Sequence, residues 1–179
     1  MQDNERDNTA TQTAGYDTAG THTAGTDTGS MGAPGDSSPS LWAKRMGFGG
    51  LLPFVLLALA VWLAVPTYRA FAGLALLGYG AVIASFLGAM YWGLVMREGA
   101  PPSLAVLGWG VSPSLVAWVA LMLGPVPGLW VVAGLLWACY AADRVLYPRF
   151  GVQGWLPMRW TLTVVASASC LLGALGLMR

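Results

Sequence analysis

Charged residues are scarce in this chain: they make up 9% of its 179 residues, whereas apolar residues make up 56%. Soluble globular domains carry roughly 25% charged residues, so this composition excludes an ordinary water-soluble domain and indicates a protein surrounded by lipid. The few charges are also unevenly distributed. Residues 1–40 are acidic and residues 41–179 are basic, so the net charge of +1 is the sum of two opposite populations and gives no information on partners.

Histidine is absent from residues 41–179, since the single histidine of the chain is His22. This excludes bis-histidine haem ligation, a histidine zinc site and a Ser–His or Cys–His catalytic pair in that part. The chain also lacks a P-loop, a dinucleotide-binding glycine pattern and paired aspartates. Cys139 and Cys170 lie in long apolar runs, which indicates buried thiols rather than a disulfide framework. We therefore expect a non-enzymatic protein with no cofactor, no metal and no bound nucleic acid.

Residues 1–40 form a polar, low-complexity tail. Residues 13–27 read TAGYDTAGTHTAGTD, a five-residue repeat with almost no aliphatic side chains. Such a segment cannot bury enough apolar surface to offset the entropy of ordering, so we predict that it is disordered. The tail has no early apolar stretch, as a secretory signal would, and its acidity is unlike a mitochondrial presequence. We therefore expect a bacterial inner-membrane protein whose first spanning helix acts as an uncleaved signal.

Five apolar segments in residues 41–179 are long enough, or nearly so, to cross a bilayer. A span needs about 20 apolar residues, and it must be helical because lipid cannot satisfy free peptide groups. The predicted fold is therefore an all-α, polytopic membrane bundle of about five helices. The predicted spans are residues 48–65, 70–96, 103–123, 128–146 and 160–178.

The basic residues predict the orientation of these spans. Two of them, Arg69 and Arg179, fall on the side opposite the tail. Because basic loops stay in the cytoplasm, we expect a cytoplasmic N-terminus and an external C-terminus. The six basic residues on the tail side are Lys44, Arg45, Arg97, Arg144, Arg149 and Arg159.

The second predicted span carries two rows of small residues at four-residue spacing. Such rows allow membrane helices to approach closely, so this span is expected to be the packing centre of the bundle. The alternative is a permeation path lined by small side chains. The first row is Gly80, Ala84 and Gly88, and the second is Ala81, Ser85, Ala89 and Gly93.

Pro113 lies in the middle of the third predicted span. It cannot donate a hydrogen bond to the carbonyl of Trp109, so a kink or a break is expected there. Two interpretations remain open, a kink satisfied locally and a ligand site at a broken helix. The residues predicted to surround a ligand at such a site are Tyr79, Ser85, Tyr91, Trp92, Trp109, Ser112 and Pro113.

Asp143 lies at the C-terminal end of the fourth predicted span, where the helix dipole disfavours a negative charge. A cationic partner is therefore expected, and Arg159 and Arg97 are the candidates on the same side of the membrane. The pair can be an interfacial salt bridge that locks helices together. The alternative is a proton or anion site.

Several segments resemble the membrane family known as domain of unknown function 3429, which includes bacterial proteins and the mitochondrial transmembrane protein 69 of animals. The resemblance covers about residues 41–178 and implies a five-helix membrane fold, without implying an activity. Tyr91 departs from the family, whose members often have histidine at that position. The segments that carry the resemblance are GLLPF (50–54), YGAVIASFLG (79–88), YWG (91–93), PSLVAW (113–118), Asp143-Arg144, GWLP (154–157), Arg159 and residues 161–163.

Two functions are compatible with these features. The first is a non-enzymatic integral membrane protein that acts through helix or lipid contacts, for instance by supporting a membrane complex with a partner protein or with further copies of itself. The second is a small carrier, or a quinone- or lipid-binding protein, with its site near the interrupted third span.

Overall fold

The computed structural model describes residues 40–98 and 103–179, all of which belong to one compact unit. The predicted tail, apart from Ser40, lies outside the described residues. The described part of the chain is helical and contains no strand. Its elements are α1 (Leu41–Gly49), α2 (Leu52–Leu63), α3 (Pro66–Glu98), α4 (Leu104–Met122), α5 (Pro125–Leu146), η1 (Gln153–Trp155) and α6 (Leu156–Leu177).

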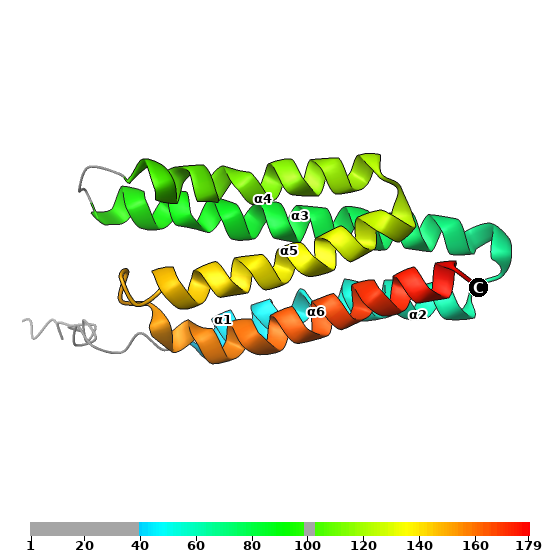
Figure 1. Ribbon diagram of the computed structural model, residues 1–179. Coiled ribbons are helices and arrows are strands. Elements are labelled where there is room, and N and C mark those ends of the chain that lie inside the picture. The colour runs from blue at the N-terminus through cyan, green and yellow to red at the C-terminus, as the bar shows by residue number, and fades with distance from the viewer. Residues whose placement is uncertain (1–39, 99–102) are drawn as a thin grey trace, which may run out of the picture. The chain divides into compact units, whose positions relative to one another are not determined.

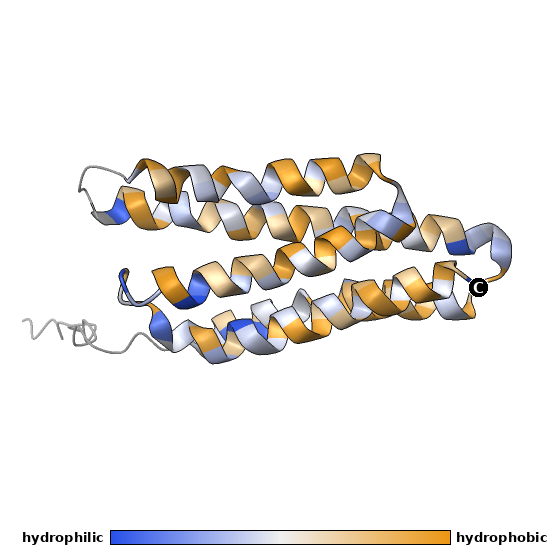
Figure 2. Cartoon of the chain, in the orientation of Figure 1, coloured by the Kyte–Doolittle hydropathy of each residue, from blue (hydrophilic) through white to orange (hydrophobic). Residues whose placement is uncertain are grey.

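These helices form five candidate membrane spans, with α1 and α2 together making the first. Large apolar side chains face outward along them: Leu63 is 80% exposed, Phe71 72% and Leu104 86%. In Figure 2 the hydrophilic residues concentrate near the ends of the helices. Lipid is the solvent that such a surface requires. The predicted all-α, five-span membrane bundle is confirmed.

The first and last spans begin earlier than predicted. The first span begins at Leu41 instead of residue 48, and Ser40 caps it by accepting a hydrogen bond from the Ala43 backbone N–H at 3.2 Å. The apolar pattern missed this turn because it contains exposed Lys44 and Arg45. The last helix, α6, begins at Leu156 instead of residue 160. Its first turn contains Pro157, whose missing N–H has no cost there.

Prolines also start two other helices. Pro66 and Pro125 are the first residues of α3 and α5, so these helices begin four and three residues before the predicted positions. The turn before α5 requires Gly124, whose φ of 84° is in the left-handed region. The connections are therefore shorter than the apolar pattern suggested.

Of the two alternatives left open at Pro113, a kink satisfied locally and a broken helix, the broken helix is wrong. Helix α4 runs without interruption from Leu104 to Met122, and Ser112 Oγ donates to the Gly108 carbonyl at 2.8 Å. Pro113 is buried against α3, where a Cβ atom on Gly88 would lie 3.1 Å from its ring and would overlap the Gly110 carbonyl. A glycine facing a proline-containing helix thus allows close packing, and the proline is accommodated without a broken helix.

Helix α3 contacts α2, α4, α5 and α6. The first row of small residues, from Gly80 to Gly88, is buried along its whole length. The second row is buried at Ala81 only, since Ala89 and Gly93 are exposed. One face of α3 therefore packs at the centre, and the second row turns away from it.

The basic residues gather at one end of the bundle. The start of α1, the end of α3 and the α5–α6 connection lie at that end, whereas the α2–α3 and α4–α5 turns and the C-terminus lie at the other (Figure 1). This arrangement brings the basic residues Lys44, Arg45, Arg97, Arg144, Arg149 and Arg159 to the same membrane boundary.

Candidate functional site

A buried polar cluster joins three helices at the basic end of the bundle. Asp143 of α5 is 2% exposed and Arg159 of α6 is 7% exposed. Arg159 Nε donates to Asp143 Oδ2 at 2.7 Å, and Arg159 Nη2 lies 2.7 Å from the same oxygen. The Tyr91 hydroxyl of α3 donates to Asp143 Oδ1. The carboxylate therefore receives donors from both neighbouring helices.

Burial determines how this ion pair contributes to the stability of the bundle. Two charges removed from solvent stabilise a protein only when both remain paired, because the loss of either partner leaves an uncompensated charge. Arg159 Nη2 is buried and makes no well-directed hydrogen bond in the described part of the chain, although it lies within ion-pair distance of Asp143. An arginine carries five N–H groups, and Nε and Nη2 are the nitrogens at Asp143, so the accessible donor capacity left on the guanidinium is that of Nη1.

The second cationic candidate, Arg97, is used elsewhere. Its Nη2 donates to the Phe150 carbonyl at 3.2 Å, in the connection between α5 and α6. That connection also places buried Tyr147 beside the polar cluster, with its ring centroid 6.4 Å from that of Tyr91. Burial is the main cause that raises the pKa of the Tyr147 phenol to about 12; the nearby Asp143 carboxylate also raises this pKa, and the Arg159 guanidinium lowers it. Tyr147 is therefore a neutral wall of the cluster at physiological pH.

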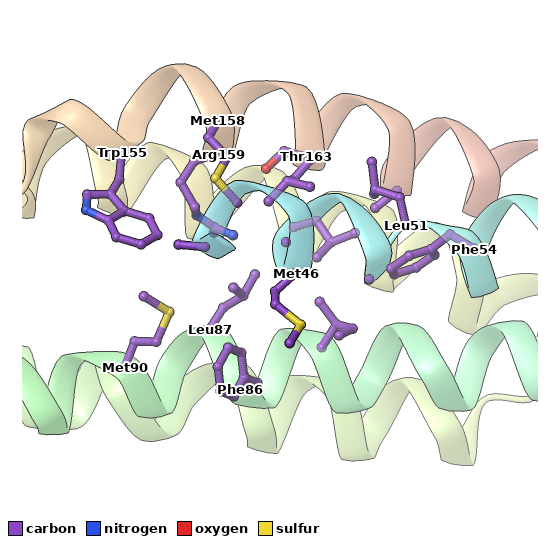
Figure 3. A pocket seen from close by; sticks show the side chains of 17 residues that line it. Met46, Leu51, Phe54, Phe86, Leu87, Met90, Trp155, Met158, Arg159 and Thr163 are labelled. Carbon is purple, nitrogen blue, oxygen red and sulfur yellow. The ribbon is translucent and has the colours of Figure 1, made fainter. Parts of the chain in front are cut away.

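An apolar cavity of about 440 Å³ adjoins this cluster. It lies between α1 and α2 on one side and α3 and α6 on the others, and Figure 3 shows side chains from these helices around it. The volume falls within the roughly 300–1,000 Å³ of ligand pockets. Most lining side chains are aliphatic, aromatic or thioether groups, including Met46, Leu51, Phe54, Phe86, Leu87, Met90, Trp155 and Met158.

The cavity and the polar cluster share Arg159. Among the described residues that line the cavity, this arginine is the one ionisable side chain, and Thr163 lies one turn further along α6. In Figure 3 the Arg159 side chain extends from α6 toward the space that faces Leu87 and Met90. The arrangement is an apolar chamber with a hydrogen-bond donor in its wall, which can bind and orient an amphiphile.

The cavity opens sideways between α1 and α3. Met46 of α1 and Phe86 of α3 both line it, yet they are 78% and 61% exposed. Helix α1 packs on α6, whereas α2 packs closely on both α3 and α6. The opening therefore faces the same surroundings as the outer surface of the spans.

The seven residues predicted as ligand-binding do not line this cavity. Tyr79 donates to the Gly50 carbonyl at 2.8 Å and packs edge-on against Phe54. Ser85 donates to the Ala81 carbonyl at 2.9 Å. Trp92 covers Gly110 of α4. The structure therefore distributes these residues over different helix contacts. Tyr91 belongs to the Asp143 cluster. The remaining three members of the predicted set lie on α4: Trp109, Ser112 and Pro113.

Sequence reasoning missed two features of the site. It did not connect Tyr91 with Asp143, although Tyr91 follows Ala84 and Gly88 by seven and three residues and so shares their face of α3. It also did not find the cavity, because the α1 residues that line it lie before the predicted first span. Helical periodicity could have shown the first feature, but no sequence signal shows the second.

Comparison with known proteins agrees with the membrane fold. A family model described as "Protein of unknown function (DUF3429)" matches residues 40–175. Transmembrane protein 69 of Xenopus tropicalis is 35% identical over 139 residues, which cover 74% of this chain and 53% of the relative. The chain thus spans about half the length of that relative. No solved structure matches this chain. The family match covers most of the membrane bundle, and the chain therefore belongs to the DUF3429 family of proteins of unknown function.

Proposed function

We propose that this protein is a non-enzymatic membrane protein that holds the apolar chain of a membrane amphiphile in the cavity between α1, α2, α3 and α6. The observation that carries this proposal is the sideways opening of an apolar chamber, at Met46 and Phe86, toward the lipid-facing surface. A ligand that already resides in the bilayer can enter there without crossing water.

A reaction is not needed to explain the side chains around the cavity. Within residues 40–98 and 103–179 the lining offers one ionisable group, Arg159, and its partner Asp143 already accepts from Arg159 and Tyr91. Binding and orientation are the actions that such a site performs without a general acid, a general base or a nucleophile.

Photocrosslinking with a phospholipid that carries a diazirine near the end of one acyl chain tests this function. The full chain in nanodiscs should be labelled on cavity residues that do not face outward, such as Leu87, Met90 and Met158, as mapped by peptide mass spectrometry. Ala43→Phe places a ring at the cavity wall and should remove that labelling. Ala105→Phe is the matched control, because Ala105 is exposed on α4 away from the cavity. Labelling that is equal in all three proteins, or confined to outward-facing residues, would contradict the proposal.

We also propose that the basic end of the bundle faces the cytoplasm of a bacterium, in its inner membrane. The collection of six basic residues at that end supports this orientation. A reporter that is active only outside the cytoplasm should work when it is fused after Arg179. If that reporter is inactive and a cytoplasmic reporter fused at the same position is active, the C-terminus faces the cytoplasm and the proposed orientation is wrong.

A further inference from the structure

Arg159 is the charged side chain among the mostly apolar described residues that line the cavity. A lipid chain gains almost no hydrophobic free energy by moving from the bilayer into an apolar cavity, because both environments are hydrocarbon. Selection among membrane amphiphiles must therefore come from polar contacts. The guanidinium of Arg159 is the strongest hydrogen-bond donor in the cavity wall.

The charge balance of the polar cluster restricts what Arg159 can bind. The Asp143 carboxylate neutralises the guanidinium at 2.7 Å, and both groups are buried. A ligand carboxylate beside this pair would leave a net negative charge without solvent, which is costly. A neutral acceptor, such as the carbonyl of an ester, would use the donor capacity that Asp143 leaves over and add no charge.

The depth of Arg159 agrees with an ester carbonyl. It is the fourth residue of α6, so it lies about 5 Å along the axis from the start of that helix, at 1.5 Å per residue. Ala166, which also lines the cavity, lies about 10 Å deeper by the same rise. A glycerolipid has the same order of groups, with ester linkages near the membrane boundary and hydrocarbon below them.

Positive charge lies just outside the cavity. Lys44 is exposed on α1, next to Ala43 and two residues before Met46, both of which line the chamber. Arg45 follows it and packs over the Trp42 ring, with its guanidinium carbon 5.5 Å from the ring centroid. A phosphate above an ester that is bound at Arg159 would lie at this boundary, where basic side chains attract it.

We propose that the occupant of the cavity is a glycerophospholipid, with one acyl chain in the chamber, its ester carbonyl accepting from Arg159 and its phosphate near Lys44. This inference rests on the proposed function and specifies the ligand class of the same site. A diacylglycerol has the same ester and chains without the phosphate. A fatty acid has a carboxylate in place of the ester, and a quinone has carbonyls without a glycerol phosphate.

Competition against the photoreactive phospholipid tests the proposal. The purified full chain is labelled in the presence of unlabelled dioleoyl phosphatidylglycerol, dioleoylglycerol, oleate or ubiquinone. The phospholipid should protect the cavity best, the diacylglycerol several-fold less well, and oleate and quinone least. Protection by quinone or oleate equal to that by the phospholipid would overturn the assignment.

Two variants test the individual contacts. Lys44→Gln should weaken protection by the phospholipid several-fold and leave that by dioleoylglycerol unchanged, whereas the control Arg179→Gln, at the other end, should change neither. Arg159→Lys retains the charge opposite Asp143 but loses the planar fork, so it should weaken protection by both ester lipids, as measured below the melting temperature of the variant. Unchanged protection by the phospholipid in Lys44→Gln would refute the headgroup assignment, and unchanged protection by both ester lipids in Arg159→Lys would refute the ester contact. If Ala43→Phe fails to abolish labelling by any probe, the proposed function itself fails, which distinguishes the two outcomes.

Discussion

Replacement of Asp143 by asparagine tests the reasoning about the buried polar cluster most directly. The substitution preserves size and keeps an oxygen for the Tyr91 hydroxyl, but it removes the charge opposite Arg159. The guanidinium would then be buried without a counter-charge, since Arg159 is 7% exposed. We therefore expect Asp143→Asn to destabilise the bundle strongly.

The magnitude follows from the burial of both partners. An exposed ion pair contributes about 0–1 kcal/mol, whereas removal of one partner of a buried pair costs about 3–5 kcal/mol. Asp143 is 2% exposed, and two guanidinium nitrogens approach its carboxylate at 2.7 Å, so the buried value applies. Asp143→Asn should therefore lower the free energy of unfolding by about 3–5 kcal/mol.

The assay is equilibrium unfolding in mixed micelles, with tryptophan fluorescence as the signal, on a double-mutant cycle. Asp143→Asn, Arg159→Gln and the double variant are compared with wild type, and Arg144→Gln is the control because Arg144 is the exposed neighbour of Asp143. The double variant should be more stable than the sum of the two single losses predicts, because it leaves no uncompensated charge. Additive losses, or a loss in Asp143→Asn no larger than in the control, would refute the buried-pair argument.

Two further predictions concern helix packing and pH. Gly88→Ala should destabilise the protein by about 1–3 kcal/mol, because the new Cβ would overlap the Gly110 carbonyl and lie 3.1 Å from Pro113. Gly93→Ala is the control, since a Cβ at Gly93 has nothing within 4 Å. In the same unfolding assay this control should be neutral or slightly stabilising. Tyr147 has a pKa of about 12 when folded against an ordinary value of 10.0, so its contribution to stability is complete below pH 10 and is lost as the pH rises toward 12. Tyr147→Phe should flatten the fall in stability over that interval, and an unchanged pH profile would show that its phenol is not coupled to folding.

The fold was predictable from local properties of the chain. Each of the five spans is recognisable because about 20 apolar residues must form a helix in lipid, and each predicted span overlaps a helix of the structure. The errors lie at the ends. The predicted first span omits most of α1, which carries the exposed residues Lys44 and Arg45. The predicted starts at residues 70, 128 and 160 lie after Pro66, Pro125 and Pro157, although proline fits the first turn of a helix.

The expected break at Pro113 shows a different limit. The missing N–H of a proline is visible in the sequence, but the shape of the opposing helix surface is not. Gly88 provides a flat surface on α3 that accepts the proline-containing segment of α4, so α4 stays continuous. The predicted ligand residues around this segment were grouped on the assumption of a break, and the structure places them at separate helix contacts.

The sequence by itself determined that this is a helical membrane protein with a basic boundary on one side, because hydrophobicity, helix length and charge are additive properties of neighbouring residues. It also identified Asp143 as a group that needs a cation, since a carboxylate near the hydrocarbon requires one. Only the tertiary structure decided that Arg159 and Tyr91 bind it, and that an apolar chamber lies beside them. The reason is that a cavity is the space left between helices. The separation of α1 from α3 depends on how α2 and α6 pack, and these contacts join residues far apart in the sequence.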